Sequence, residues 1–106
     1  VYKRQRQFDS SPIPIHQISR IRKSINKSTV LIYDTGIRNG EDILKALCLG
    51  ADFVMIGKHA LFSIAAEGFD GLVQMTNNLK KEIEIAMAQM GNFDINKLNS
   101  KYLNDF

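Results

Sequence analysis

The 106-residue sequence has no tryptophan, a single cysteine and only two prolines. One cysteine, Cys48, excludes an internal disulfide framework and favours a reducing compartment, so we expect a cytoplasmic protein. Cys48 lies between Leu47 and Leu49 on an expected helix, which predicts a buried and unreactive thiol. No apolar run approaches the roughly 18 residues that a membrane-spanning helix needs. We also expect no signal peptide, because the first residues have neither an apolar core region nor a cleavage pattern.

The charged residues do not form the stripe that nucleic-acid binding requires. The formal net charge is +3, and hydrophobic residues make up 44% of the chain, as in an ordinary globular domain. Basic residues cluster in two places without interleaved aromatic residues, so we interpret them as solvated surface and expect no nucleic-acid partner. The two clusters are Lys3, Arg4 and Arg6, and Arg20, Arg22, Lys23 and Lys27.

Hydrophobic periodicity predicts an alternating series of helices and strands. The two expected strands are continuous apolar runs, which are typical of a parallel sheet covered on both faces. A two-stranded sheet of this kind does not make a stable domain, so the pattern indicates a slice of a larger α/β protein. The expected strands are 29–33 and 53–56. The expected helices are 14–26, one that has Glu41 and Asp42 in its first turn and stops at Gly50, 59–66, and 69–90 after a break at Gly68, and a further helix starts near Asp94.

Each expected strand is followed by a glycine and a cation. The first strand leads into Asp34-Thr35-Gly36-Ile37-Arg38, and the second leads into Gly57-Lys58. Glycine lets the backbone approach a ligand closely, and the start of the next helix points free N–H groups at an anion. In β/α barrels, the loops after the seventh and eighth strands commonly form such a phosphate site with a short extra helix. The spacing therefore predicts phosphate binding, with simple turn geometry as the alternative.

Residues 33–68, YDTGIRNGEDILKALCLGADFVMIGKHALFSIAAEG, resemble the C-terminal part of the FMN-dependent 2-hydroxy acid dehydrogenases and oxidases. The family pattern there is D-G-G-x-R-x-G-x-D-x-x-K-A-x-x-L-G-A followed by G-R. Near the start, Arg6-Gln7-Phe8-Asp9 resembles the family segment H-G-G-R-Q-L-D. The resemblance implies an α/β fold, namely the C-terminal part of a TIM (β/α)8 barrel with about its last two βα units and the C-terminal helices. It makes residues 1–106 a single fragment of an FMN-binding domain.

The resemblance also implies a cofactor, a substrate and site residues. FMN is the implied cofactor, and the implied reaction oxidises an L-2-hydroxy acid such as lactate or glycolate to the 2-oxo acid. Arg6 matches the catalytic arginine that binds the substrate carboxylate. The full-length enzyme is expected to be a homo-oligomer, and peripheral membrane contact is left open. The residues that match the FMN site are Asp34, Thr35, Gly36, Ile37, Arg38, Gly57 and Lys58.

Three positions depart from the family pattern. Thr35 stands where the pattern has a glycine, and Lys58 replaces an arginine, which keeps the charge but loses the planar fork. Lys3 stands at the position of the catalytic histidine, and agreement with the family begins only at Arg6. We interpret residues 1–5 as non-native and expect this fragment to be inactive alone. His59 falls where the family has no catalytic group, so we expect it to be structural.

Two alternatives stay open. The chain could belong to another FMN- or phosphate-binding TIM barrel of the isomerase or nucleotide dehydrogenase type, although the segment from Arg6 to Asp9 favours the 2-hydroxy acid enzymes. It could also be a non-catalytic module that folds by itself, which predicts a cooperative unfolding transition for the 106 residues.

Overall fold

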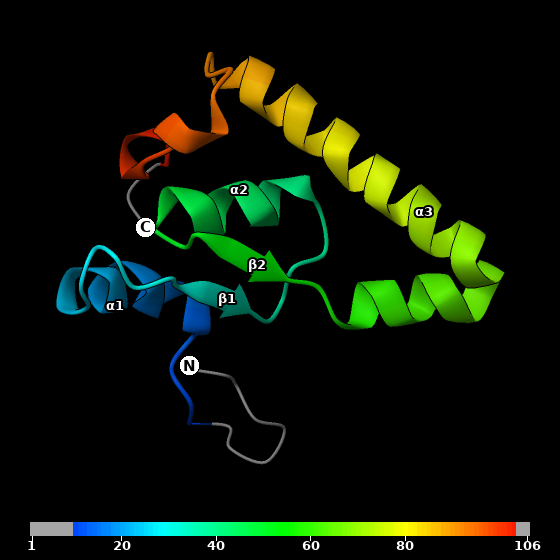
Figure 1. The fold of residues 1–106 in the computed structure, drawn as a ribbon, viewed down its shortest axis with the longest axis horizontal. Helices are drawn as coiled ribbons and strands as arrows, with labels where there is room; N and C mark the ends of the chain where they lie inside the picture. The colour runs from blue at the N-terminus through cyan, green and yellow to red at the C-terminus, as the bar shows by residue number, and fades with distance from the viewer. Residues whose placement is uncertain (1–9, 104–106) are drawn as a thin grey trace.

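Two short parallel strands lie at the centre of the structure, a computed structural model that describes residues 10–103 of the chain (Figure 1). Strand β1 is Ile32–Asp34 and strand β2 is Phe53–Met55. The register pairs Ile32 with Phe53 and Asp34 with Met55, so both strands end at the same edge of the sheet. The sequence placed the first strand at 29–33, but regular pairing begins only at Ile32. Leu31 before it donates to the Asp52 carboxylate and accepts from the N–H groups of Asp52 and Phe53.

Helix α2, Gly40–Cys48, connects the two strands as a β-α-β crossover. Its start is set by Asn39, whose Oδ1 accepts a hydrogen bond from the Asp42 N–H at 2.9 Å. Gly50 follows its end with a φ of +111°, a conformation that favours glycine. The face toward the rest of the chain includes Cys48, which is buried as predicted.

Helix α1, Ile18–Ser24, is preceded by a 3-10 turn at Pro14–Gln17. The sequence predicted one helix over 14–26, which is wrong in its first turn and at its last two residues. Pro14 supplies no N–H and begins a tighter turn. Ile18 is 3% exposed and packs with Ala46 and Ala51, which attaches α1 to the α2–β2 connection.

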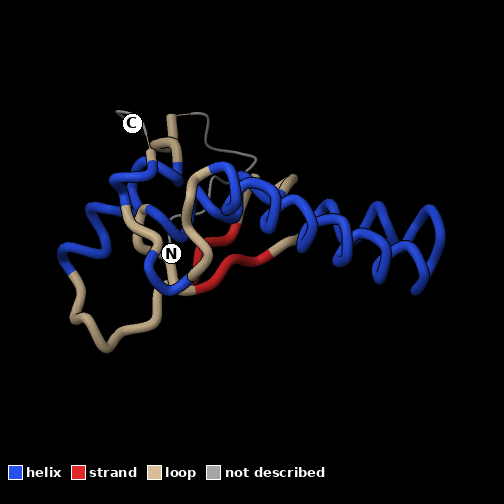
Figure 2. Tube along the Cα trace, turned by 90° about the horizontal axis from the view of Figure 1, so that it is seen from above, coloured by secondary structure: helices blue, strands red, loops and turns tan. Residues whose placement is uncertain are grey.

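Helix α3, Lys58–Gln89, bends sharply at a point nearer its start than its end (Figure 1). The bend lies at Glu67 and at Gly68, which has a φ of +61°, so the predicted break is confirmed. Beyond it, the buried Met75 and Leu79 pack with residues around α2 in one hydrophobic cluster. The bent end of α3 extends past the two strands (Figure 2). For this reason Phe69 is 76% exposed, although its helical spacing with Leu72 and Leu79 predicts a shared buried face.

The tail after α3 consists of two 3-10 turns, Ile95–Lys97 and Ser100–Tyr102. Asp94 begins the first of them, because its Oδ1 accepts a hydrogen bond from the Asn96 N–H at 3.0 Å. The predicted start near Asp94 is therefore present, but it opens a single turn instead of a longer helix.

One face of the sheet packs on helices and the other is open in the described part of the chain. Tyr33 and Val54 point into the hydrophobic clusters on the helix side. Their neighbours on the opposite face are Ile32, Phe53 and Met55, which are 45%, 61% and 54% exposed. Within residues 10–103, the sequence expectation of strands covered on both faces therefore holds for one face only.

Candidate functional site

The parallel register brings the two predicted glycine turns to one edge of the sheet. Asp34 and Met55 are register partners and are the last residues of their strands. The turn from Thr35 to Arg38 and the turn from Ile56 to Lys58 therefore begin side by side. The sequence placed all its described site residues in these two turns or at the end of β1, and the structure brings the two turns together.

The turn after β1 has an unusual backbone. Gly36 has a φ of +70°, and no atom lies within 4 Å of the position that a Cβ would take, so its backbone borders open space. Thr35 has a φ of +146°, which a β-branched residue rarely adopts. The side chain of Ile37 is 6% exposed and packs in the core, so it anchors the turn and leaves any ligand contact to its backbone.

The start of α2 is less open to an anion, because three N–H groups of this segment already have acceptors. The Arg38 N–H donates to Asp42 Oδ2 at 3.1 Å, and the Gly40 N–H donates to Glu82 Oε2 at 2.6 Å. The Asp42 N–H is taken by Asn39. Two carboxylates therefore occupy the position where the helix dipole would attract a phosphate. The exposed side chain of Arg38 is what this turn offers to an anion.

The start of α3 is open by contrast. Gly57 precedes the helix without a side-chain cap, and no atom lies within 4 Å of a Cβ position there. The first hydrogen bond of the helix runs from the Leu61 N–H to the Gly57 carbonyl, at 3.0 Å. The N–H groups of Lys58, His59 and Ala60 precede it and have no acceptor within the helix. This helix start fits an anion in both hydrogen bonding and dipole direction.

The charges and donors of the two turns suit a phosphate group. Arg38 and Lys58 are exposed, and neither makes an ion pair with any residue between 10 and 103. Two cations and the open amides of α3 provide charge and donors for a dianion, and Gly36 and Gly57 leave room for it. Asp34 is half-buried at the end of β1, where it already makes an interaction within the chain.

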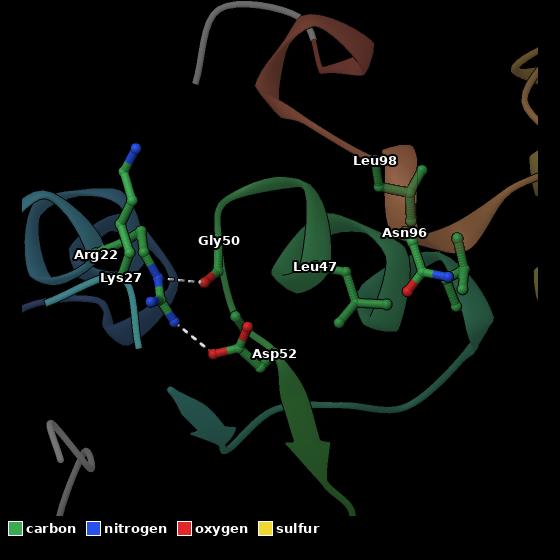
Figure 3. A pocket seen from close by; sticks show the side chains of 9 residues that line it. Arg22, Lys27, Leu47, Gly50, Asp52, Asn96 and Leu98 are labelled. Carbon is green, nitrogen blue, oxygen red and sulfur yellow. Dashed lines mark hydrogen bonds and ion pairs between the residues drawn. The ribbon is translucent and has the colours of Figure 1, made fainter. Parts of the chain in front are cut away.

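A separate cavity of about 430 Å³ lies at the other end of β2 (Figure 3). Arg22 closes one side, where its Nε donates to the Gly50 carbonyl at 2.9 Å and its Nη2 pairs with Asp52. None of the predicted FMN-site residues borders this cavity. Its lining is Arg22, Lys27, Leu47, Gly50, Ala51, Asp52, Ile95, Asn96 and Leu98.

Two long-range contacts, one at each edge of the sheet, have no signal in the sequence. The sequence pattern places Arg22 in a solvated basic cluster and does not distinguish Glu82 from other surface carboxylates. Arg22 bonds to Gly50 and Asp52, which are 28 and 30 residues away in the sequence. Glu82 bonds to Gly40, which is 42 residues away. No local sequence pattern could reveal contacts at such separations. The predicted substrate arginine, Arg6, lies outside the described residues.

The described part of the chain lacks two further classes of feature. Between residues 10 and 103, no group of three or more histidine, cysteine, aspartate or glutamate side chains is placed to hold a metal ion. No helix in the same range has the length and apolar character to cross a membrane.

Known proteins of similar sequence are 2-hydroxy acid oxidases by name. A sequence profile described as FMN-dependent dehydrogenase matches residues 5–105. A 2-hydroxyacid oxidase of Dictyostelium discoideum is 37% identical over 100 residues, which cover 94% of this chain and 26% of that protein. An L-lactate oxidase of Lacticaseibacillus rhamnosus is 38% identical over 86 residues, which cover 81% of this chain and 23% of that protein.

Solved structures agree with this relationship. A soluble mutant of the membrane-associated (S)-mandelate dehydrogenase from Pseudomonas putida superposes with a TM-score of 0.87 at 34% identity, over 95% of this chain and 28% of that one. A flavocytochrome b2 variant with sulfite bound gives a TM-score of 0.86 at 32% identity, over 93% and 27%. The chain thus spans about a quarter of the length of these relatives. With the profile match and these identities, the chain belongs to the FMN-dependent dehydrogenase family, whose cofactor is FMN.

Proposed function

We propose that this chain provides the FMN-phosphate site of an oxidoreductase that converts an L-2-hydroxy acid, such as lactate or glycolate, to the 2-oxo acid. The observation that carries the proposal is the pair of adjacent turns at one sheet edge. One turn presents Arg38, and the other presents Lys58 with the open N–H groups of α3. The names of the related proteins support a 2-hydroxy acid as substrate.

The place of the chain in a barrel is part of the proposal. We assign β1 and β2 to the seventh and eighth strands of a TIM (β/α)8 barrel, and the first half of α3 to the extra helix of its phosphate site. The parallel pairing and the helical crossover support this assignment. The open sheet face also supports it, because Ile32, Phe53 and Met55 would fill the interior of a closed barrel.

Each site residue has a proposed role. Gly57 and Lys58 bind the phosphate through the start of α3 and the lysine ammonium, and Arg38 binds it from the β1 side. Asp34, Thr35 and Gly36 contact the ribityl chain and the adjoining phosphate, with the backbone of Ile37 holding the turn in place. FMN held by these residues would supply the redox chemistry of the reaction. The protein therefore holds the cofactor in position and does not itself undergo redox change.

Arg6 is the proposed partner of the substrate carboxylate. A guanidinium can donate two parallel hydrogen bonds to a carboxylate and neutralise it, which fixes the hydroxyl-bearing carbon relative to the flavin. Lys3 occupies the position of the family's catalytic histidine, so we propose that turnover needs a proton acceptor from outside these 106 residues.

The proposal is tested with the full-length product of the gene that encodes this chain. The purified protein should contain FMN, and anaerobic addition of L-lactate, glycolate or (S)-mandelate should bleach its flavin absorbance. A protein that contains FMN but is not bleached by any 2-hydroxy acid would support a different FMN barrel. A protein that takes up no flavin would support a non-catalytic module.

The cellular setting is also a proposal. The lone buried cysteine is compatible with a cytoplasmic protein. One related structure, however, is described as the monotopic membrane protein (S)-mandelate dehydrogenase. Cell fractionation of the full-length protein distinguishes the two locations, and sedimentation of the soluble fraction measures the proposed homo-oligomer.

A further inference from the structure

Glu82 joins the second half of α3 to the start of α2. Its Oε2 accepts a hydrogen bond from the buried Gly40 N–H at 2.6 Å, between residues 42 positions apart. The backbones are also close here, because a Cβ on Gly40 would lie 2.7 Å from Glu82 Cβ and 2.7 Å from the Ile83 nitrogen. The carboxylate therefore holds Gly40 at a point of contact where no larger residue fits.

This contact is one of two anchors on either side of Arg38. On one side, Ile37 is buried against Ile43 and other core residues. On the other side, Gly40 is held by Glu82. The Arg38 N–H is itself bonded to Asp42. The backbone that carries the Arg38 side chain is thus fixed before and after that residue, and only the side chain remains free to adjust.

We propose that Glu82 is a positioning residue of the flavin site, which acts through Gly40 to present Arg38 at the sheet edge. This inference rests on the proposed function of the two turns as the FMN-phosphate site. The carboxylate has a second effect, because its negative charge satisfies the positive end of the α2 dipole. The α2 start then offers fewer donors and less positive potential to the phosphate, which is directed to Arg38 and to the open start of α3.

The test compares FMN with riboflavin, which lacks the phosphate, in the full-length gene product. Dissociation constants for both flavins are measured by flavin fluorescence in Glu82→Ala, Glu82→Gln and Glu84→Ala. Glu84 is exposed on the same helix and is the matched control for the lost charge. We expect Glu82→Ala to weaken FMN binding by about tenfold, the size of effect seen when a supporting contact to a ligand-binding group is removed.

Riboflavin affinity should change by less than about twofold in Glu82→Ala, because a supporting contact affects only the group that it supports, and riboflavin has no phosphate for Arg38 to bind. Glu84→Ala should match the wild type for both flavins. Glu82→Gln keeps an acceptor but loses the charge, so FMN affinity should fall by about threefold, since a charge-assisted hydrogen bond is roughly twice as strong as a neutral one. This milder variant decides the matter if Glu82→Ala does not fold.

The two proposals fail in different ways. If Glu82→Ala and Glu82→Gln weaken FMN and riboflavin equally, Glu82 serves only general stability and the inference is overturned. If Glu82→Ala still weakens FMN in an Arg38→Ala background, the residue does not act through Arg38 and the inference is likewise overturned. If the wild-type protein itself binds FMN no better than riboflavin, the proposed phosphate site fails independently of Glu82.

Discussion

Arg22 of α1 and Asp52, the residue before β2, form an ion pair in which Nη2 and Oδ2 are 2.5 Å apart. The same guanidinium donates from Nε to the Gly50 carbonyl at 2.9 Å and from Nη1 to the Thr29 carbonyl at 3.1 Å. Asp52 also accepts a hydrogen bond from the Leu31 N–H at 2.8 Å. One pair of side chains therefore joins α1 to the amino ends of both strands, at the edge opposite the proposed flavin site.

Loss of Arg22 should destabilise the fold. The Arg22 side chain is 21% exposed and its donors serve three acceptors, so Arg22→Ala should lower the free energy of unfolding by about 2 kcal/mol. Arg22→Lys should recover only part of this loss, because an ammonium cannot reproduce the fork. Urea denaturation measures both changes. Arg20→Ala removes an exposed arginine from the same helix and serves as the control; an equal loss in the two alanine variants would contradict the structural role of Arg22.

Replacing Thr35 with glycine should stabilise the fold. Its φ of +146° lies in the region that favours glycine, and such a conformation costs a non-glycine residue about 1–3 kcal/mol. After the entropic cost of glycine, Thr35→Gly should raise the free energy of unfolding by about 1 kcal/mol. Thr35→Ala keeps the Cβ and should give little gain. The two variants are compared by urea denaturation without flavin, and an equal effect of both would show that the backbone is not strained.

Much of the fold was predictable because its signals are local. The periodicity of the helix between Gly40 and Gly50 and the break at Gly68 both depend on neighbours within one or two helical turns. The burial of Cys48 followed from its position between two leucines on the apolar face of α2. The two glycine turns were placed at the strand ends by the apolar runs before them, and parallel pairing then brought the turns together.

The remainder depends on contacts that only the folded chain contains. Periodicity showed that Phe69 shares a face with Leu79, but not that the bend at Gly68 leaves the first of these residues without a neighbour. The spacing of glycine and cation predicts a phosphate site equally well at the start of α2 and at the start of α3. The difference between them arises because Glu82, distant in sequence, occupies an N–H group of α2 while the start of α3 has no side-chain cap.

Arg38 should contribute to FMN affinity through the phosphate alone. Its side chain is exposed and has no ion-pair partner among residues 10–103, so it is free to bind an anion. Arg38→Ala should weaken FMN binding by about 1.5–3 kcal/mol, the contribution of a hydrogen bond to a charged group. Riboflavin binding should stay unchanged, as should FMN binding in Arg20→Ala. Flavin fluorescence titration of the full-length protein measures each affinity, and full FMN retention in Arg38→Ala would refute the phosphate assignment.

Arg6 should separate substrate binding from cofactor binding. Arg6→Lys keeps the charge but loses the paired hydrogen bonds to a carboxylate. It should therefore reduce the turnover of 2-hydroxy acids more than it reduces the flavin content of the full-length protein. Steady-state rates and flavin absorbance measure the two quantities, and equal losses in both would count against a substrate role for Arg6.

Ionisation of the Cys48 thiol should make the fold less stable at alkaline pH. Burial raises the pKa of its thiol above the ordinary value of 9.0, although a hydrogen bond from the Asn99 backbone acts in the opposite direction. The unfolded chain then releases the thiol proton at a lower pH than the folded chain does. Above pH 9.0 the unfolded state therefore binds fewer protons, and the free energy of unfolding falls as the pH rises through the folded pKa.

A second group adds to this effect and must be separated from it. Burial, followed by the nearby Asp42 carboxylate, raises the pKa of the Tyr33 phenol above 10.0, so Tyr33 destabilises the fold in the same direction at higher pH. In urea denaturation at a series of pH values, Cys48→Ala should show a shallower loss of stability just above pH 9.0, and Tyr33→Phe should do so above 10.0.

Cys48→Ala also leaves a small cavity, which lowers stability equally at every pH and so does not alter the slope. If Cys48→Ala keeps the wild-type slope, or if the native thiol reacts with a thiol reagent as fast as the unfolded chain does, the thiol is not shielded in the way that its burial requires.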